Sequence, residues 1–267
     1  MKISKLLALF GVLILLLTSP AYVSAAPPDN AGKGPLDKTV FVHYPRPEPA
    51  RPAKPGPGGT GTLSSDYKYS GVHWANPAVS YYVNPANSGV DTSITVAAIR
   101  ASFDTWDNAS GALSYTNVGT TALAGGNLDG YNVVSWADIS SQYPGAIAVT
   151  IVWSYRYNKQ IAEVDTLMNI GSGFTWSYTA PDTAHDLSGT ATADASRYTD
   201  PSNGGVAGTY DIRNIMTHEA GHWLMLGDLY NSTDNELTMY GYGSTGQIKK
   251  DTLGYGDELG VERIYGP

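Results

Sequence analysis

Apolar and polar positions along residues 79–168 follow first a strand pattern and then a helix pattern. The segment 79–83 combines Val and Tyr between two Asn-Pro pairs, which predicts a strand. From Asp91 onward apolar side chains recur every three or four residues, which predicts an amphipathic helix over residues 91–109. Further apolar runs bounded by Gly, Asn or Pro predict strands at 113–116, 132–136, 146–153 and 161–168.

A second helical pattern lies near the C-terminus. Residues 170–209 lack periodicity and are rich in Gly, Ser, Thr and Asp, so they predict a long surface excursion. Apolar side chains then return at helical spacing between Ile212 and Leu224. The order strand, helix, several strands and helix predicts an α+β fold with one sheet against two long helices.

The first 25 residues have the features of a signal peptide. Lys2 and Lys5 precede an unbroken apolar run over 6–17, and small residues at 23–25 form a cleavage pattern. The run is short for a bilayer span, although an N-terminal anchoring helix that is never removed is the alternative. We therefore expect a secreted, extracellular chain that has no membrane contact once the signal is removed.

Residues 26–60 contain more than half of the 16 prolines and end in a glycine-rich stretch. Such a composition predicts an extended, polyproline-rich leader or linker that buries no core. It leaves open whether the segment is an inhibitory propeptide, a cleaved leader or a tether. Residues 61–267 have the length of one domain with a substantial core.

The composition and charge exclude several kinds of partner and of metal site. The net charge is −8, and most of the acidic excess falls within residues 61–267, so we expect no nucleic-acid partner. The chain has no cysteine, which excludes disulfides and thiolate metal sites. A bound metal would therefore depend on His, Asp or Glu. We expect a monomer.

The candidate chemistry lies on the second helix. His218 and His222 are four residues apart, which on a helix is about 40° around the axis and about 6 Å along it, so both imidazoles can reach one ion. Glu219 lies beside them, where a carboxylate can take a proton from a metal-bound water. This H-E-x-x-H spacing is the zinc metalloprotease pattern, and it uses two of only five histidines.

Two imidazoles leave a zinc site short of a protein ligand. Asp228 is the favoured third ligand because Gly227, just before it, can let the chain leave the helix and fold back. Glu258 and Glu262 are the competitors, as distant ligands on a further helix. A carboxylate that only caps the turn is the alternative role of Asp228.

These motifs resemble those of the metzincin clan of zinc metalloproteases, in its matrixin-like bacterial and archaeal branch. The histidine motif followed by Asp228 is similar to the metal-binding segment of that clan. Residues 237–242 resemble its methionine turn, with Met239 beneath the metal, and residues 260–267 resemble its closing helix. The resemblance covers about 200 residues and implies a twisted, mainly parallel five-stranded sheet, two long helices, a short C-terminal helix and a substrate cleft.

The chain also departs from the matrixin pattern. Met225 stands where the family has glycine, so we expect the chain reversal to depend on Gly227. The absence of cysteine means that the cysteine switch of matrixins cannot operate. Leu167 occupies the position of a structural-zinc histidine, so we expect one catalytic Zn²⁺. The many aspartates make Ca²⁺ a further candidate, although no calcium-loop motif locates it.

The sequence therefore predicts a secreted zinc endopeptidase acting on protein or peptide substrates. Glu219 is the expected general base, and His218, His222 and Asp228 are the expected zinc ligands. A matrixin-like cleft would hold the substrate as an added strand along the edge formed by residues 146–153. Two alternatives stay open: an exported adhesion or binding module with zinc but no proteolysis, and a zinc peptidase that uses Glu258 as its third ligand.

Overall fold

A computed structural model describes residues 34–47, 64–179 and 204–267. The predicted signal peptide lies outside these ranges, as do parts of the predicted linker and of the excursion over 170–209. Across the described ranges, no helix is both long enough and apolar enough to cross a membrane.

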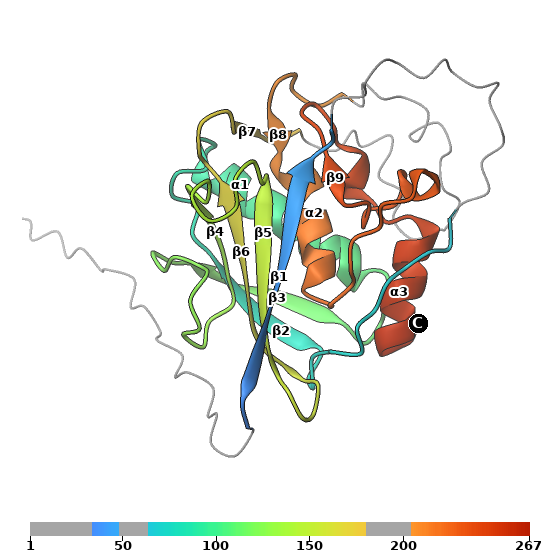
Figure 1. Ribbon diagram of the computed structural model, residues 1–267. Helices are drawn as coiled ribbons and strands as arrows, with labels where there is room; N and C mark the ends of the chain where they lie inside the picture. Colours follow the sequence, from blue (N-terminus) through green and yellow to red (C-terminus); the bar gives the residue numbers. More distant parts are fainter. Residues whose placement is uncertain (1–33, 48–63, 180–203) are drawn as a thin grey trace, which may run out of the picture.

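The main sheet is mixed and mostly parallel (Figure 1). Its seven strands lie in the order β3 (Ser114–Thr120), β2 (Ala78–Val83), β4 (Val133–Ala137), β6 (Ile161–Asn169), β5 (Ala148–Tyr155), β1 (Leu36–Pro45) and β9 (Tyr242–Gly243). Only β5 runs antiparallel to its neighbours, β6 and β1. The five strands predicted from the sequence all form, but the expectation of a five-stranded sheet is wrong, because β1 and β9 extend it.

Within the described ranges, three α-helices accompany the sheet: α1 (Thr92–Asp107), α2 (Ile212–His222) and α3 (Tyr255–Tyr265). The Asp91 side chain caps α1 by accepting hydrogen bonds from the backbone amides of Ser93 and Ile94. Helices α1 and α2 are held together by the Trp106 indole, which donates to the carbonyl of Thr217 at 2.8 Å. At 11 residues, α2 is no longer than the C-terminal α3, so only α1, with 16 residues, is distinctly long.

The core lies between the sheet and the two central helices. Its largest fully buried side chains include Tyr81 on β2, Phe103 and Trp106 on α1, and Trp223 at the end of α2. Short elements complete the described chain: β7 (Trp176–Ser177), which pairs with β8 (Tyr210–Asp211), and the 3-10 helices η1 (Ser232–Asp234) and η2 (Lys249–Asp251). Because β8 leads directly into α2, the β7–β8 pair fixes where α2 begins.

Strand β1 corrects the linker prediction. Residues 36–45 are not a polyproline linker but a ten-residue strand, paired antiparallel with β5 from Leu36, opposite Tyr155, to His43, opposite Ala148. The prolines that dominated the composition flank this strand, whereas its centre is rich in β-branched and aromatic residues, which favour strands. Composition averaged over 35 residues therefore concealed a local strand pattern.

A buried carboxylate on β6 fixes the loop before β4. Asp165 accepts hydrogen bonds from the backbone amides of Gly126 at 2.6 Å and Val133 at 2.9 Å. Burial raises the pKa of Asp165 to about 8, although these two hydrogen bonds oppose the shift. Nearby Glu163, whose pKa burial raises to about 7, adds to the shift through its negative charge.

We expect this carboxylate to make stability fall with rising pH. Its folded-state pKa of about 8 exceeds the 3.8 of an ordinary aspartate, so the folded chain holds the extra proton and is favoured at low pH. That advantage is lost as pH rises towards 8, by at most about 1.4 kcal/mol per pH unit. Urea unfolding of the wild type and of Asp165→Asn between pH 5 and 8 measures the effect. The variant should show the shallower decline, and parallel curves would contradict the assignment.

Candidate metal centre

Helix α2 carries the H-E-x-x-H motif into the protein interior. Asp211 caps its start, accepting a hydrogen bond from the amide of Asn214. His218, Glu219 and His222 are all fully buried. A buried charged or ionisable group is costly unless it has a partner, so this burial requires specific neighbours.

The chain reverses at Met225 rather than at Gly227, contrary to expectation. Met225 has a φ of 59°, a left-handed conformation that non-glycine residues rarely adopt, whereas Gly227 does not have a positive φ. The Met225 amide donates to the carbonyl of His222 at 2.9 Å, and the Gly227 amide donates to Lys68 at 2.9 Å. The turn returns the chain to the histidines and places Asp228 beside them.

Three ligand atoms converge at this point. One carboxylate oxygen of Asp228, Oδ1, lies 3.2 Å from Nε2 of His218 and 3.6 Å from Nε2 of His222. Nδ1 of His218 lies 2.7 Å from the carbonyl of Thr238, and Nδ1 of His222 lies 2.7 Å from that of Leu226. A carbonyl can only accept, so these contacts favour a hydrogen on each Nδ1 and leave each Nε2 facing Asp228.

None of these three atoms has a hydrogen-bond partner, although all are buried. Burial would raise the pKa of Asp228, but the two imidazoles, His222 foremost, outweigh it and hold that pKa well below its usual range. Burial lowers the pKa of His218 to about 3. His218, His222 and Asp228 therefore form a group whose ligand atoms could hold a metal ion.

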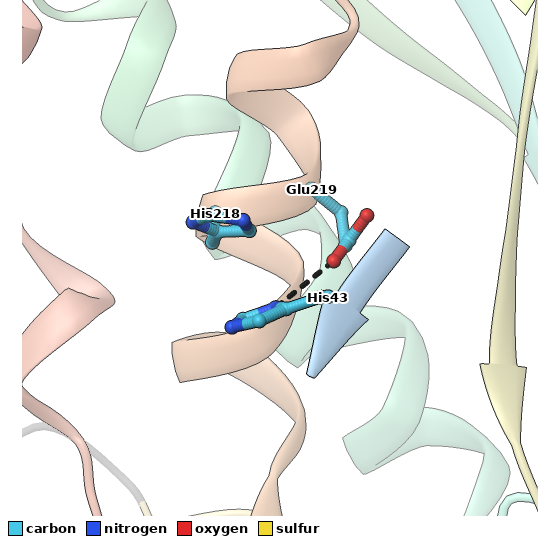
Figure 2. Close-up of side chains that lie close together, drawn as sticks. All are labelled: His43, His218 and Glu219. Carbon is cyan, nitrogen blue, oxygen red and sulfur yellow. Dashed lines mark hydrogen bonds and ion pairs between the residues drawn. The ribbon is translucent and has the colours of Figure 1, made fainter. Parts of the chain in front are cut away.

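Glu219 lies next to this cluster with both oxygens engaged. Oε2 accepts a hydrogen bond from the Thr150 hydroxyl at 2.6 Å, and Oε1 lies 3.1 Å from Nδ1 of His43 on β1 (Figure 2). Burial raises the pKa of Glu219 to about 7, with the Thr150 hydrogen bond opposing the shift. A carboxyl group with a pKa near neutrality can both accept and release a proton at physiological pH.

A chain of hydroxyl groups behind Glu219 was not predicted from the sequence. The Trp223 indole donates to Thr166 at 2.9 Å, and the Thr166 and Thr150 hydroxyls are 2.8 Å apart. Because the indole can only donate, Thr166 is left to donate to Thr150, and Thr150 to Glu219. The two threonines lie opposite each other on β5 and β6, and this register could not be inferred from either strand alone.

The predicted methionine turn packs against the motif helix. Met239 is buried, and a Cβ added at Gly221, between the two histidines, would lie 2.2 Å from its sulfur. The Asp257 carboxylate accepts from the amides of Thr238 at 2.7 Å and Met239 at 3.0 Å, and so fixes the turn to α3. Asp257 was not singled out from the sequence, because only the fold brings it to the turn.

His43 and Lys250 also reach the centre from outside the motif. Both side chains are buried, and Nε2 of His43 lies 3.3 Å from Nζ of Lys250. Lys250 also donates to the carbonyl of Tyr240. The His43 imidazole lies 4.0 Å from that of His218, centroid to centroid (Figure 2). No sequence motif marks either residue, and only the position of β1 reveals the contact.

Two groups of residues within the described ranges could hold a metal ion. One comprises His218, His222 and Asp228, and the other comprises His43, His218 and Glu219. The first is favoured because its atoms lack other partners, whereas the Glu219 oxygens and His43 are already engaged. Neither Glu258 nor Glu262 belongs to a metal-binding group within the described residues.

Comparisons with known proteins add no assignment. No protein-family model matches the chain, and no curated protein has a matching sequence.

Proposed function

We propose that this chain is a secreted zinc-dependent endopeptidase of the matrixin-like metzincin type. The observation that carries the proposal is the convergence of three buried, unpartnered ligand atoms from His218, His222 and Asp228. Tetrahedral zinc with bonds of about 2.0–2.1 Å has neighbouring ligand atoms about 3.3 Å apart. The measured 3.2 and 3.6 Å from Asp228 to the two imidazoles fit that spacing.

The donor set also fits a catalytic rather than a structural site. His218, His222 and Asp228 would hold the ion, which would supply a Lewis acid for a water and a substrate carbonyl. Glu219 is positioned beside the ligands to accept the proton of the attacking water and to deliver it to the leaving amine. Thr150 holds its carboxylate in place through Oε2.

An extended peptide is the substrate that the surroundings favour. The edge of β5 that faces away from β6 pairs with a segment in strand conformation, which in this structure is β1. Strand addition supplies backbone hydrogen bonds whatever the side chains are, so it suits protein substrates. The β5–β1 register leads directly to the buried Glu219, because His43 pairs with Ala148 at the end of the ladder.

The test is made on the secreted chain. Its N-terminus is sequenced, its zinc content is measured, and casein hydrolysis is assayed with and without a zinc chelator. We expect one zinc per chain and hydrolysis that the chelator abolishes and added zinc restores. Stoichiometric zinc without hydrolysis by any processed form would favour the exported binding module instead.

Thr150 provides a narrower prediction about positioning. Thr150→Val keeps the side-chain shape but removes the hydroxyl that donates to Glu219. We expect kcat to fall by about 10- to 100-fold while zinc content stays unchanged, since a hydrogen bond to a charged group contributes about 1.5–3 kcal/mol. Thr150→Ser, which keeps the hydroxyl, is the matched control and should retain most of kcat. Equal losses in both variants would show that packing at β5 matters rather than the hydrogen bond.

A further inference from the structure

Strand β1 lies along the β5 edge to which we propose that a peptide substrate adds. It pairs with β5 from Leu36 to His43 and then with β9 at Tyr44 and Pro45, so it lies between these two strands in the sheet (Figure 1). The Phe41 ring stacks on the imidazole of His222, with centroids 4.1 Å apart and planes within 5° of parallel. The segment 41–43 therefore covers both motif histidines.

His43 is the residue of β1 that enters the centre, and it is the only fully buried one in the strand. A neutral imidazole with its hydrogen on Nδ1 satisfies both contacts, because Nδ1 donates to Glu219 while Nε2 accepts from the Lys250 ammonium. His43 thereby occupies the carboxylate oxygen that Thr150 leaves free. Each carboxylate oxygen of Glu219 therefore already has a hydrogen-bond partner in the protein, and His43 must move before a water can take its place at Oε1.

Several other side chains of β1 make contacts at the periphery of the domain. Val40 and Val42 pack on a small apolar cluster separate from the main core, and Asp37 forms an exposed ion pair with Arg156 at 2.6 Å. No residue of β1 is among the buried members of the main core, although the partly buried Phe41 packs against that core. Releasing β1 therefore breaks its ladders with β5 and β9 and the contacts of Phe41 and His43, while the buried members of the main core stay in place.

We propose that residues 36–45 are an internal blocking strand that occupies the peptide groove, and that His43 closes the centre by bonding Glu219 and Lys250. The inference rests on the proposed peptidase function for its biological role. It assigns to this chain a latency device built from a histidine. Removal or displacement of β1 would then expose the β5 edge and release the Glu219 carboxylate together.

The first test displaces β1 in the full-length secreted chain. Val40→Asp with Val42→Asp places two charges against the small apolar cluster and should weaken docking of the strand. The probe is a fluorescein-labelled synthetic peptide of residues 35–46, followed by anisotropy, with mass spectrometry to score its hydrolysis apart from binding. We expect the double variant to bind the probe at least tenfold more tightly than the wild type. Hydrogen exchange of the amides over 148–155 should accelerate in the variant and slow again with the probe.

The second test isolates His43. His43→Phe keeps a ring but loses both hydrogen bonds, and Tyr44→Phe, at an exposed neighbouring position, is its matched control. We expect stronger probe binding in His43→Phe and wild-type behaviour in Tyr44→Phe. If the double variant fails to fold, this pair decides. Equal probe binding by the wild type and His43→Phe would overturn the proposal.

These measurements separate the blocking strand from the peptidase function. Probe binding and hydrogen exchange require no catalysis. If the β5 edge opens but the chain shows neither bound zinc nor hydrolysis, the blocking role of β1 is supported and the peptidase function is refuted. Full hydrolysis by an unprocessed wild-type chain, with β1 amides protected, would support the peptidase and refute the block.

Discussion

Replacing Glu219 with Gln is expected to reduce casein hydrolysis by about 100- to 10,000-fold, the range typical of a lost general acid–base catalyst. The amide has nearly the shape of the carboxylate and can still accept the Thr150 hydrogen bond, but it cannot take a proton from water. Zinc content should stay at the wild-type level, because Glu219 does not belong to the favoured ligand group. Activity and bound zinc are measured together on each preparation.

The experiment is made both in the wild-type background and in the chain that carries Val40→Asp and Val42→Asp. In the wild type, a closed groove would mask the loss, whereas the opened chain should display its full size. Glu262→Gln, the same substitution at an exposed position on α3, is the control and should leave activity unchanged. Retained hydrolysis in opened Glu219→Gln chains would refute Glu219 as the base, even if zinc is bound.

The elements closest to the motif could be predicted because their signals are local. The helical spacing of apolar residues and the Asp91 cap define α1, and the four-residue spacing of the histidines is sufficient to bring both imidazoles to one side of α2. Asp228 was also within reach of sequence reasoning, since it follows His222 by a short turn. The predicted position of the turn, at Gly227, is wrong. A left-handed backbone at a non-glycine residue costs about 1–2 kcal/mol, which on sequence alone disfavours Met225. In the structure, the packing of the buried Met225 side chain offsets that cost.

The rest of the site depends on contacts between distant parts of the chain. His43 and Glu219 are separated by 176 positions, and Thr150 and Glu219 by 69. Such contacts follow from the order and register of the sheet, which no local pattern encodes. The proline-rich surroundings of β1 concealed its strand pattern, so the residue that reaches Glu219 from outside the motif was assigned to a linker.

Asp228→Ala is expected to lower zinc affinity by at least about 100-fold. Loss of a residue that only hydrogen-bonds to a metal ligand typically costs about 10- to 100-fold, and Asp228 is itself a proposed ligand. It also leaves Nε2 of His218 and His222 buried without their anionic neighbour. Zinc is measured by titration against a competing chelator of known affinity. Glu258→Ala is the matched control, since it removes a carboxylate from the alternative position on α3, and it should leave the affinity unchanged.

A third variant completes this comparison. His43→Phe removes a member of the other residue group that could hold a metal, together with the imidazole that faces Glu219. If zinc sits among His218, His222 and Asp228, only Asp228→Ala should lower the affinity, and His43→Phe should leave it unchanged. Zinc loss in Glu258→Ala would establish a distant-glutamate peptidase. Loss in His43→Phe would instead place the ion at the opposite side of His218, where β1 would be a ligand-bearing part of the centre and could not be a strand that leaves it.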